Sequence, residues 1–177
     1  IRDEVSKGRQ AFIVCPFIEP SDSISASAAT TEYQRLNEGA FSDLKVGLLH
    51  GLMPLNDKQK IMDEVRGGKI DVLIATPIIE VGVDIPNATV TVIMSAERFG
   101  LAQLHQLRGR VGRGKFNSYC FLVPTQGSES GNERLQILVQ NSDGFDLSEE
   151  DFEQIRQAPV ILQDRIYGCD VRVMVLD

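Results

Sequence analysis

Five short apolar segments alternate with more polar segments along most of the chain. The first of them is apolar on both of its faces, as strands of a buried parallel sheet require. The apolar segments are residues 10–17, 44–49, 70–75, 88–95 and 118–123. Because helix-like segments separate them, this order predicts an α/β fold: a doubly wound parallel sheet flanked by helices and joined by right-handed crossovers.

The segments between the strands carry loop and helix signals. Small polar residues at 18–31 predict a loop. Asn56 or Asp57 can cap the helix that follows the second strand, and Gly67 ends that helix. Further helices are expected at about 31–39, from about residue 101 onward, and at 132–140.

Composition fits one globular domain with a substantial core, because 42% of the 177 residues are hydrophobic. With a net charge of −7 and an isoelectric point of about 4.9, the chain as a whole does not attract nucleic acid. Basic residues nevertheless gather in one segment, in which only Glu97 carries the opposite charge. These residues are Arg98, Arg108, Arg110, Arg113 and Lys115. Such a local cationic site fits an anionic ligand held at one point better than a broad DNA track.

One motif in this segment combines amide and guanidinium groups at helical spacing. Gln106, Arg110 and Arg113 stand at relative positions 0, +4 and +7, on one stripe of a helix that starts near residue 101. Gly109 and Gly112 lie between them, and each costs about 1 kcal/mol of helix stability relative to alanine. Glycines at such positions allow a ligand to approach the backbone closely. Because arginine stays charged and forks around phosphate oxygens, the motif predicts a phosphate-sensing arginine pair.

The same segment has two other readings. It could be a solvated basic helix end with Gly114 as its C-cap. Residues 109–115 also nearly spell a phosphate-cradling P-loop, but Phe116 stands where the loop needs Ser or Thr, and the segment follows a helix instead of a strand. The sequence has no other P-loop and no strand that ends in paired acids. The arginine pair is therefore expected to be half of a site.

Three more polar residues stand where predicted strands or turns end. His50, with Gly51, ends the second strand, at the edge where open parallel sheets bind ligands, although a lone histidine there is more often a capping or turn residue. Thr76 comes just past the third strand. Asp84 follows a glycine turn and could accept a hydrogen bond from a sugar hydroxyl, or it could simply form the turn before Pro86.

Cysteine and hydropathy patterns exclude other classes of site. The three cysteines are far apart and form no CxxC pair, and histidines do not cluster, so we expect no metal site. Cys15 and Cys120 lie in apolar runs, where a buried structural thiol is usual. No apolar run approaches about 18 residues and no signal peptide is present, so we expect a cytoplasmic protein without a membrane span.

Three sets of motifs resemble, in order and spacing, the later motifs of superfamily 2 helicases. They are His50-Gly51, Ala75-Thr76 with Gly82-Val83-Asp84, and Gln106 to Arg113. Longer stretches are similar to the RecG family of bacterial ATP-dependent DNA helicases of replication-fork regression, namely residues 8–16, 79–88, 96–114 and 133–145. Transcription-repair coupling translocases are similar over AERFGLAQLHQLRGRVGR and are the nearest alternative. The resemblance implies the second of two RecA-like lobes: a P-loop-NTPase-type parallel sheet without a Walker A loop.

The resemblance also assigns the motif residues to ATP. In this family ATP lies in a cleft between two lobes, and the first lobe carries the P-loop and the acidic motif. Arg113 would be the arginine finger on the γ-phosphate, Arg110 its partner on phosphate or the acidic motif, and Gln106 would help to position them. Such a finger acts in the closed state and contributes on the order of 10³ to 10⁵ in rate. ATP and Mg²⁺ would be held mainly by the first lobe, and neither is expected on this chain alone.

The remaining motif residues are assigned to the ribose and the DNA. Asp84, with Gly82, would couple the nucleotide to DNA and touch the ribose. Thr76 would face the DNA backbone, and His50-Gly51 would lie near the strand path. The partners implied are branched or forked DNA, the N-terminal helicase lobe and a wedge domain of the same polypeptide, in the bacterial cytoplasm in association with the nucleoid.

The resemblance divides the chain into three parts. Residues 1–8 would be a helix end or linker from an upstream lobe, 9–145 the RecA-like domain, and 146–177 a C-terminal extension. The extension departs from the family at 154–167, where a coupling segment rich in Arg and Gly is expected. A compensated reading-frame shift and divergence are both open, and no functional residue is assigned there.

Our first hypothesis is therefore an isolated second motor lobe of a RecG-like helicase. We expect this fragment to fold alone but not to hydrolyse ATP, because the catalytic half is missing. Three alternatives stay open: the corresponding lobe of a transcription-repair coupling translocase, a non-motor nucleic-acid- or protein-binding module with helicase-like remnants, and a small-molecule nucleotide-binding enzyme, which the missing P-loop disfavours.

Overall fold

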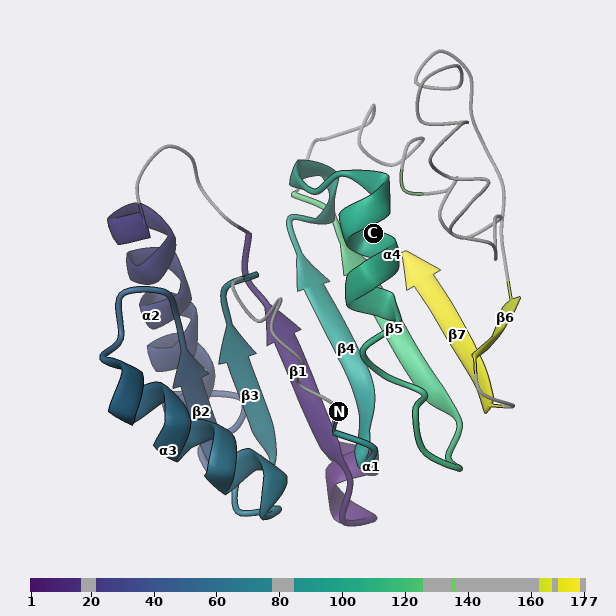
Figure 1. Ribbon diagram of the computed structural model, residues 1–177, viewed down its shortest axis with the longest axis horizontal. Coiled ribbons are helices and arrows are strands. Elements are labelled where there is room, and N and C mark those ends of the chain that lie inside the picture. The colour runs from purple at the N-terminus through teal and green to yellow at the C-terminus, as the bar shows by residue number, and fades with distance from the viewer. Residues whose placement is uncertain (17–21, 78–84, 126–134, 136–162, 167–168, 176–177) are drawn as a thin grey trace.

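The strands of the chain form one sheet. A computed structural model describes residues 1–16, 22–77, 85–125, 135, 163–166 and 169–175. Within these residues the strands are β1 (Gln10–Val14), β2 (Val46–Leu49), β3 (Val72–Ala75), β4 (Ala88–Met94), β5 (Ser118–Val123), β6 (Gln163–Ile166) and β7 (Cys169–Val175). They lie side by side in the order β2-β3-β1-β4-β5-β7-β6 (Figure 1).

Neighbouring strands are parallel except at one edge. β2, β3, β1, β4, β5 and β7 run in the same direction, and β6 pairs antiparallel with β7. The five predicted strands and their parallel arrangement are confirmed. β6 and β7 were not predicted.

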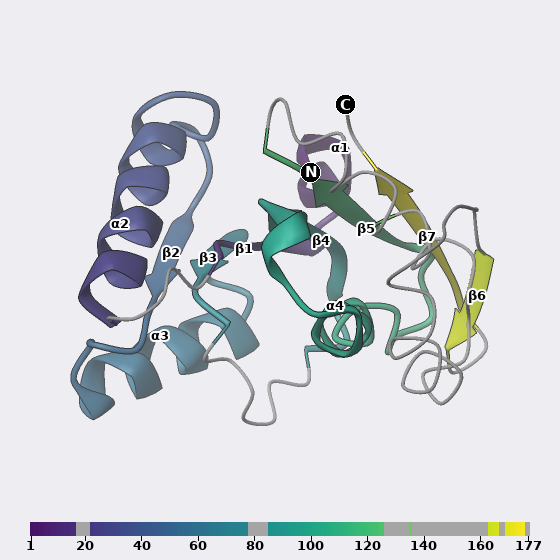
Figure 2. The same ribbon diagram turned by 90° about the horizontal axis from the view of Figure 1, so that it is seen from above.

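Helices cover both faces of the sheet. The helices of the described residues are α1 (Arg2–Ser6), α2 (Asp22–Glu38), α3 (Leu55–Arg66), the short 3₁₀ turn η1 (Ala96–Arg98) and α4 (Leu101–Arg108). Seen from above, α1 and α2 lie on one side of the sheet, and α3 and α4 lie on the other (Figure 2). Two apolar clusters follow this division. Ala29 and Leu36 of α2 belong to one, and Val65 of α3 and Leu104 of α4 belong to the other.

Strand β1 is central because the sequence lets it be buried on both faces. All five of its residues are buried, and it pairs with β3 on one side and β4 on the other. Its one polar residue, Gln10, donates hydrogen bonds from Nε2 to the carbonyl oxygens of Val65 at 2.8 Å and Ile70 at 2.7 Å. A buried amide needs such partners, and here they join the start of the strand to the end of α3.

Two helix starts differ from the sequence prediction. Helix α2 begins at Asp22, so the part of 18–31 that belongs to it is helix and not loop. Ala26 and Ala29 are buried there, because small side chains let the helix pack closely on the sheet. Helix α3 begins at Leu55 after Pro54 without a side-chain cap, so the predicted caps Asn56 and Asp57 are wrong, whereas its predicted end at Gly67 is confirmed. The helix predicted at 132–140 lies outside the described residues except for Leu135, which is helical and buried.

The described part of the chain contains no helix that is both long and apolar enough to cross a membrane. Cys15 and Cys120 are buried free thiols, as predicted, and burial raises the pKa of each to about 12. Such thiols stay protonated and unreactive at neutral pH.

Candidate functional site

Helix α4 ends earlier than the arginine motif predicts. Its last residue is Arg108, and the backbone N–H of Gly109 donates to the carbonyl of His105 at 3.0 Å. Gly112 has φ +76°, a conformation that favours glycine and cannot continue a right-handed helix. The predicted stripe of Gln106, Arg110 and Arg113 on one helix is therefore wrong, because only Gln106 is helical.

The two arginines lie instead in a loop, residues 109–116, which we call the arginine loop. Arg113 donates from Nε to the carbonyl oxygen of Gly109 at 2.9 Å, which closes the loop on itself. At Gly114 the backbone passes so close to Pro86 that a Cβ atom would overlap the Pro86 carbonyl oxygen. The reading of Gly114 as a helix C-cap is thus wrong, and its small size serves a close approach between two backbone segments.

Arg110 lies against the middle strands of the sheet. With Leu107 it lines a cavity of about 30 Å³ whose other walls come from strands β1, β3 and β4. Those walls include Ala75, the last residue of β3, and Thr91. The hydroxyl of Thr91 is buried and has no hydrogen-bond partner among the described residues. A partly buried guanidinium beside the carboxyl end of a strand can meet an anionic group that enters from solvent.

A third arginine, Arg108, does not belong to the predicted cationic site. Arg108 is completely buried, and its Nη2 lies 2.8 Å from Nδ1 of His105. Leu101, Leu104 and Arg108 are the buried residues of α4 and share one stripe of the helix. This spacing was visible in the sequence and could have shown that Arg108 supports the helix from inside.

The acidic residue of the same segment is engaged elsewhere. Glu97 accepts hydrogen bonds from the backbone N–H of Thr125 at 3.1 Å and from its hydroxyl at 2.6 Å. These bonds join η1 to the segment just after strand β5. Glu97 thus has a structural contact of its own, which the reading of Glu97 as the charge opposing the arginines did not foresee.

His50 and Thr76 lie side by side at the carboxyl edge of the sheet. They follow Leu49 and Ala75, which are partners in the β2–β3 pairing, and the N–H of Thr76 donates to the carbonyl of Leu49 at 3.1 Å. Nδ1 of His50 and Oγ1 of Thr76 are buried and have no hydrogen-bond partner among the described residues. Burial, with a contribution from the nearby charge of Lys58, lowers the pKa of His50. His50 is therefore neutral at pH 7 and offers a hydrogen bond instead of a charge.

Lys58 supplies the positive charge at this edge. Its Nζ donates to the carbonyl oxygen of Gly51 at 2.5 Å, which fixes the turn after β2. The sequence reading singled out His50 and Gly51 but missed Lys58. It stands one turn into α3, and the order of residues alone does not show that its side chain folds back over the turn.

The structure therefore unites some predicted site residues and not others. His50, Gly51 and Thr76 share one edge of the sheet, and Arg110 reaches the same strand end through the cavity that includes Ala75. Gln106 is exposed on α4. Gly82 and Asp84 lie outside the described residues. The roles assigned to all these residues stay predictions.

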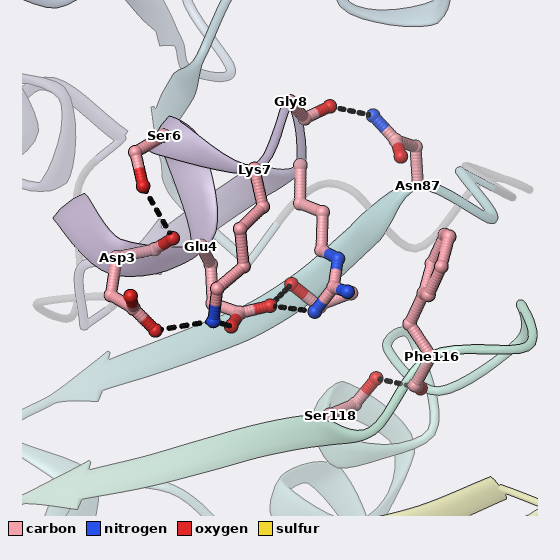
Figure 3. A network of polar contacts seen from close by, with 10 residues as sticks. Asp3, Glu4, Ser6, Lys7, Gly8, Asn87, Phe116 and Ser118 are labelled. Atoms are coloured by element: carbon pink, nitrogen blue, oxygen red, sulfur yellow. Dashed lines mark hydrogen bonds and ion pairs between the residues drawn. The ribbon is translucent and has the colours of Figure 1, made fainter.

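A second group of charges, which the sequence reading missed, lies where the chain begins. The carboxylate of Glu4 accepts hydrogen bonds from Lys7 at 3.0 Å, Arg9 at 2.5 Å and Thr89 at 2.9 Å (Figure 3). We call these four residues the N-terminal cluster. Burial alone would raise the pKa of Glu4, but the three donors outweigh it and lower that pKa to about 2. Glu4 is thus charged at neutral pH and joins α1 to strand β4.

The N-terminal cluster also touches the arginine loop. The guanidinium carbon of Arg9 lies 4.2 Å from the centre of the Phe116 ring, and Nζ of Lys115 lies 5.8 Å from it. A cation at this distance over an aromatic face is attracted by the ring. No signal in the sequence links residues so far apart along the chain.

The described residues supply an anion site more readily than a metal site. No three or more His, Cys, Asp or Glu side chains gather there as potential metal ligands. Arg110 and Arg113, by contrast, lie within one short loop and can neutralise phosphate oxygens.

Comparison with known proteins now adds to this geometry. The family described as helicase conserved C-terminal domain matches residues 1–115. The chain is 48% identical over 153 residues to the ATP-dependent DNA helicase RecG of Thermotoga maritima, covering 86% of this chain and 20% of that protein. It is 45% identical over 153 residues to RecG of Bacillus subtilis, covering 86% of this chain and 22% of that protein. The chain thus spans about a fifth of the length of these relatives.

Solved structures agree with these relatives. A structure of RecG bound to a three-way DNA junction superposes with a TM-score of 0.71 at 46% identity, covering 86% of this chain and 20% of that one. The C-terminal domain of yeast Dbp5 superposes with a TM-score of 0.55 at 16% identity, covering 97% of this chain and 79% of that one, which supports the fold alone. The RecA-like fold predicted from the sequence is confirmed.

Proposed function

We propose, from the premise that this chain belongs to the helicase conserved C-terminal domain family, that it is the second motor lobe of an ATP-dependent DNA helicase of RecG type. One observation carries the proposal. Arg110 and Arg113 lie in a single glycine-bounded loop, and Arg110 lines the cavity at the carboxyl end of strand β3. A lobe built this way can present two guanidinium groups to a nucleotide that another lobe binds.

In this proposal the arginine loop stabilises charge that develops as the γ-phosphate is transferred to water. Arg113 is the arginine finger on the γ-phosphate, and Arg110 holds phosphate or the acidic motif of the first lobe. Gln106, Gly82 and Asp84 complete the nucleotide side of the site. A guanidinium that approaches only when the lobes close favours the transition state over bound ATP. ATP and Mg²⁺ are bound mainly by the first lobe.

The carboxyl edge of the sheet is proposed to follow the DNA. The neutral imidazole of the partly exposed His50 can donate a hydrogen bond to a phosphate oxygen, and Gly51 lets the backbone of the turn approach closely. The hydroxyl of Thr76 is buried beside His50 and would meet the DNA backbone only if this edge of the sheet moved. A RecG relative has been seen bound to a three-way DNA junction, so we propose branched or forked DNA as the substrate. The first lobe and a wedge domain would belong to the same polypeptide, working on DNA in the bacterial cytoplasm.

The test uses a full-length protein that contains this chain, with Arg113 replaced by alanine. We expect DNA-stimulated ATP hydrolysis to fall about 10³-fold or more and unwinding of forked DNA to be lost, since the missing guanidinium acts on the transition state. Binding of the fork should persist, because Arg113 is not assigned to DNA. The 177-residue chain alone should not hydrolyse ATP.

The matched control is Arg98→Ala, which removes an exposed arginine of the same segment outside the arginine loop. Arg98→Ala should leave hydrolysis unchanged. Normal unwinding by Arg113→Ala would show that the chain keeps only helicase-like remnants. DNA-stimulated hydrolysis by the 177-residue chain alone would contradict the division of the site between two lobes.

A further inference from the structure

The last residue of the arginine loop, Phe116, is held by a contact with Arg9 and not by helix α4. Its near end is fixed by the turn at Gly109, and its middle by the close approach of Gly114 to Pro86. The far end is Phe116, whose ring receives the Arg9 guanidinium at 4.2 Å. Arg113 lies between these points, so its place depends on all of them.

Arg9 is itself held in one place. Its Nη1 lies 2.5 Å from Oε2 of Glu4, and only 20% of its side chain and 6% of the Glu4 side chain are exposed. Glu4 also binds Lys7 and Thr89. Because the carboxylate is held by Lys7 and Thr89 as well, it anchors the Nη1 end of the Arg9 guanidinium close to the ring.

The contact is not part of the apolar core. Phe116 is only partly buried and belongs to neither apolar cluster of the sheet faces. The contact with Arg9 therefore ties the end of the arginine loop to the N-terminal cluster and not to either apolar cluster. Figure 3 shows the Phe116 side chain beside strands β4 and β5, on the side where the Glu4 network lies.

We infer that Arg9 and Phe116 are positioning residues for the arginine loop, so that the stacked pair sets the place of Arg113 for catalysis. This inference rests on the proposed function, because it assigns no role without the arginine finger. It also gives α1 an effect on hydrolysis, since Glu4 of α1 holds Arg9. A displacement of about 1 Å in a catalytic group can cost as much as 10²-fold in rate.

The experiment compares Phe116→Leu with Phe116→Tyr in the full-length protein. Leucine keeps apolar bulk but removes the aromatic face, whereas tyrosine keeps the face. We expect Phe116→Leu to lower kcat for DNA-stimulated ATP hydrolysis about 10-fold with KM for ATP unchanged, because the finger acts on the transition state. Phe116→Tyr should keep kcat within about 2-fold of that of the unsubstituted protein. Thermal unfolding of both variants checks that the fold is retained.

A double-substitution cycle tests whether the two residues act together. Arg9→Gln alone should lower kcat about as much as Phe116→Leu, and the two combined should lower it no further. If the fold-loss of kcat in the double variant equals the product of the two single fold-losses, the two residues act independently and the inference is overturned. Equal kcat losses in the leucine and tyrosine variants, or wild-type kcat in the leucine variant, would also overturn it.

Arg113→Ala, measured in parallel, separates the two proposals. Loss of hydrolysis in Arg113→Ala with normal kcat in Phe116→Leu would overturn the positioning role and leave the proposed function intact. Normal hydrolysis in Arg113→Ala would overturn the proposed function and the positioning role with it.

Discussion

Two groups of basic side chains lie close together in this molecule and are built differently. In the N-terminal cluster, Lys7 and Arg9 share one buried carboxylate, which is charged because its pKa is about 2. In the arginine loop, Nε of Arg113 donates to a backbone carbonyl, and Arg110 lines a cavity at the end of strand β3. The first arrangement pairs its cations with a carboxylate of the chain itself, although the Lys7 side chain stays nearly half exposed. For the second we propose an anion that another lobe binds, so the surroundings of an arginine, as well as its place in a motif, bear on its role.

The largest difference between substitutions in the arginine loop and in the N-terminal cluster is expected in the rate of ATP hydrolysis. Arg110→Ala in the full-length protein should lower kcat for ATP hydrolysis about 10²-fold, because the charge proposed to hold phosphate or the acidic motif is lost. Its free energy of unfolding should change little. Steady-state hydrolysis and urea unfolding measure both quantities, and Arg98→Ala is the control. An Arg110→Ala protein that unfolds more easily yet hydrolyses ATP normally would place Arg110 among the structural arginines.

Arg108, two residues before Arg110 in the sequence, is completely buried and serves as the structural comparison. Arg108→Ala should lower the free energy of unfolding of the 177-residue chain by about 3 kcal/mol, since it leaves a cavity beneath α4 and removes the contact with His105. Urea unfolding followed by circular dichroism measures the change. A loss no larger than that of Arg98→Ala would mean that the helix does not depend on this side chain.

The contribution of the Glu4 charge to the free energy of unfolding should depend on pH. The folded pKa of Glu4, about 2, lies below the ordinary value of 4.5, so its stabilisation is full above about pH 4.5 and is lost as the pH falls towards 2. Glu4→Gln should therefore destabilise the chain at pH 7 by on the order of 2 kcal/mol, and the difference from the unsubstituted chain should shrink below pH 4.5.

Urea unfolding of both proteins from pH 7 down to pH 3 makes this comparison. Glutamine is the matched replacement because it keeps the shape and can still accept hydrogen bonds. A difference that stays constant across this range would show that the charge of Glu4 is not what stabilises the cluster.

The smallest effect is expected for an ion pair that is exposed. Arg2 binds Asp43 at 2.6 Å, but more than half of each side chain is exposed. The pKa of Asp43 is lowered by its hydrogen bond from Arg2, yet solvent screens such a pair. Arg2→Ala should shift the urea midpoint less than Glu4→Gln does, and added salt should remove the shift. An effect that persists in salt would contradict the distinction between exposed and buried charges.

Whereas β6 and β7 were missed, strands β1 to β5 were predictable because consecutive apolar residues leave a buried strand few alternatives. The start of α2 was not, because its buried face consists of small residues such as Ala26 and Ala29, which read as loop among serines and threonines. The helix predicted to carry Arg110 and Arg113 is wrong because Gly109 and Gly112 end helical structure as readily as they admit a ligand. The role of these arginines stays a prediction. The stacking of Arg9 on Phe116 depends on folding and could not be read from spacing.

The central claim is that Arg113 meets the nucleotide in the transition state and not before it. The most direct measurement is the affinity of the full-length protein, bound to forked DNA, for ADP alone and for ADP with aluminium fluoride, a mimic of the transferred phosphate. We predict that Arg113→Ala leaves the affinity for ADP unchanged and abolishes the additional affinity for the mimic. An Arg113→Ala protein that still prefers the mimic as strongly as the unsubstituted protein would contradict the account.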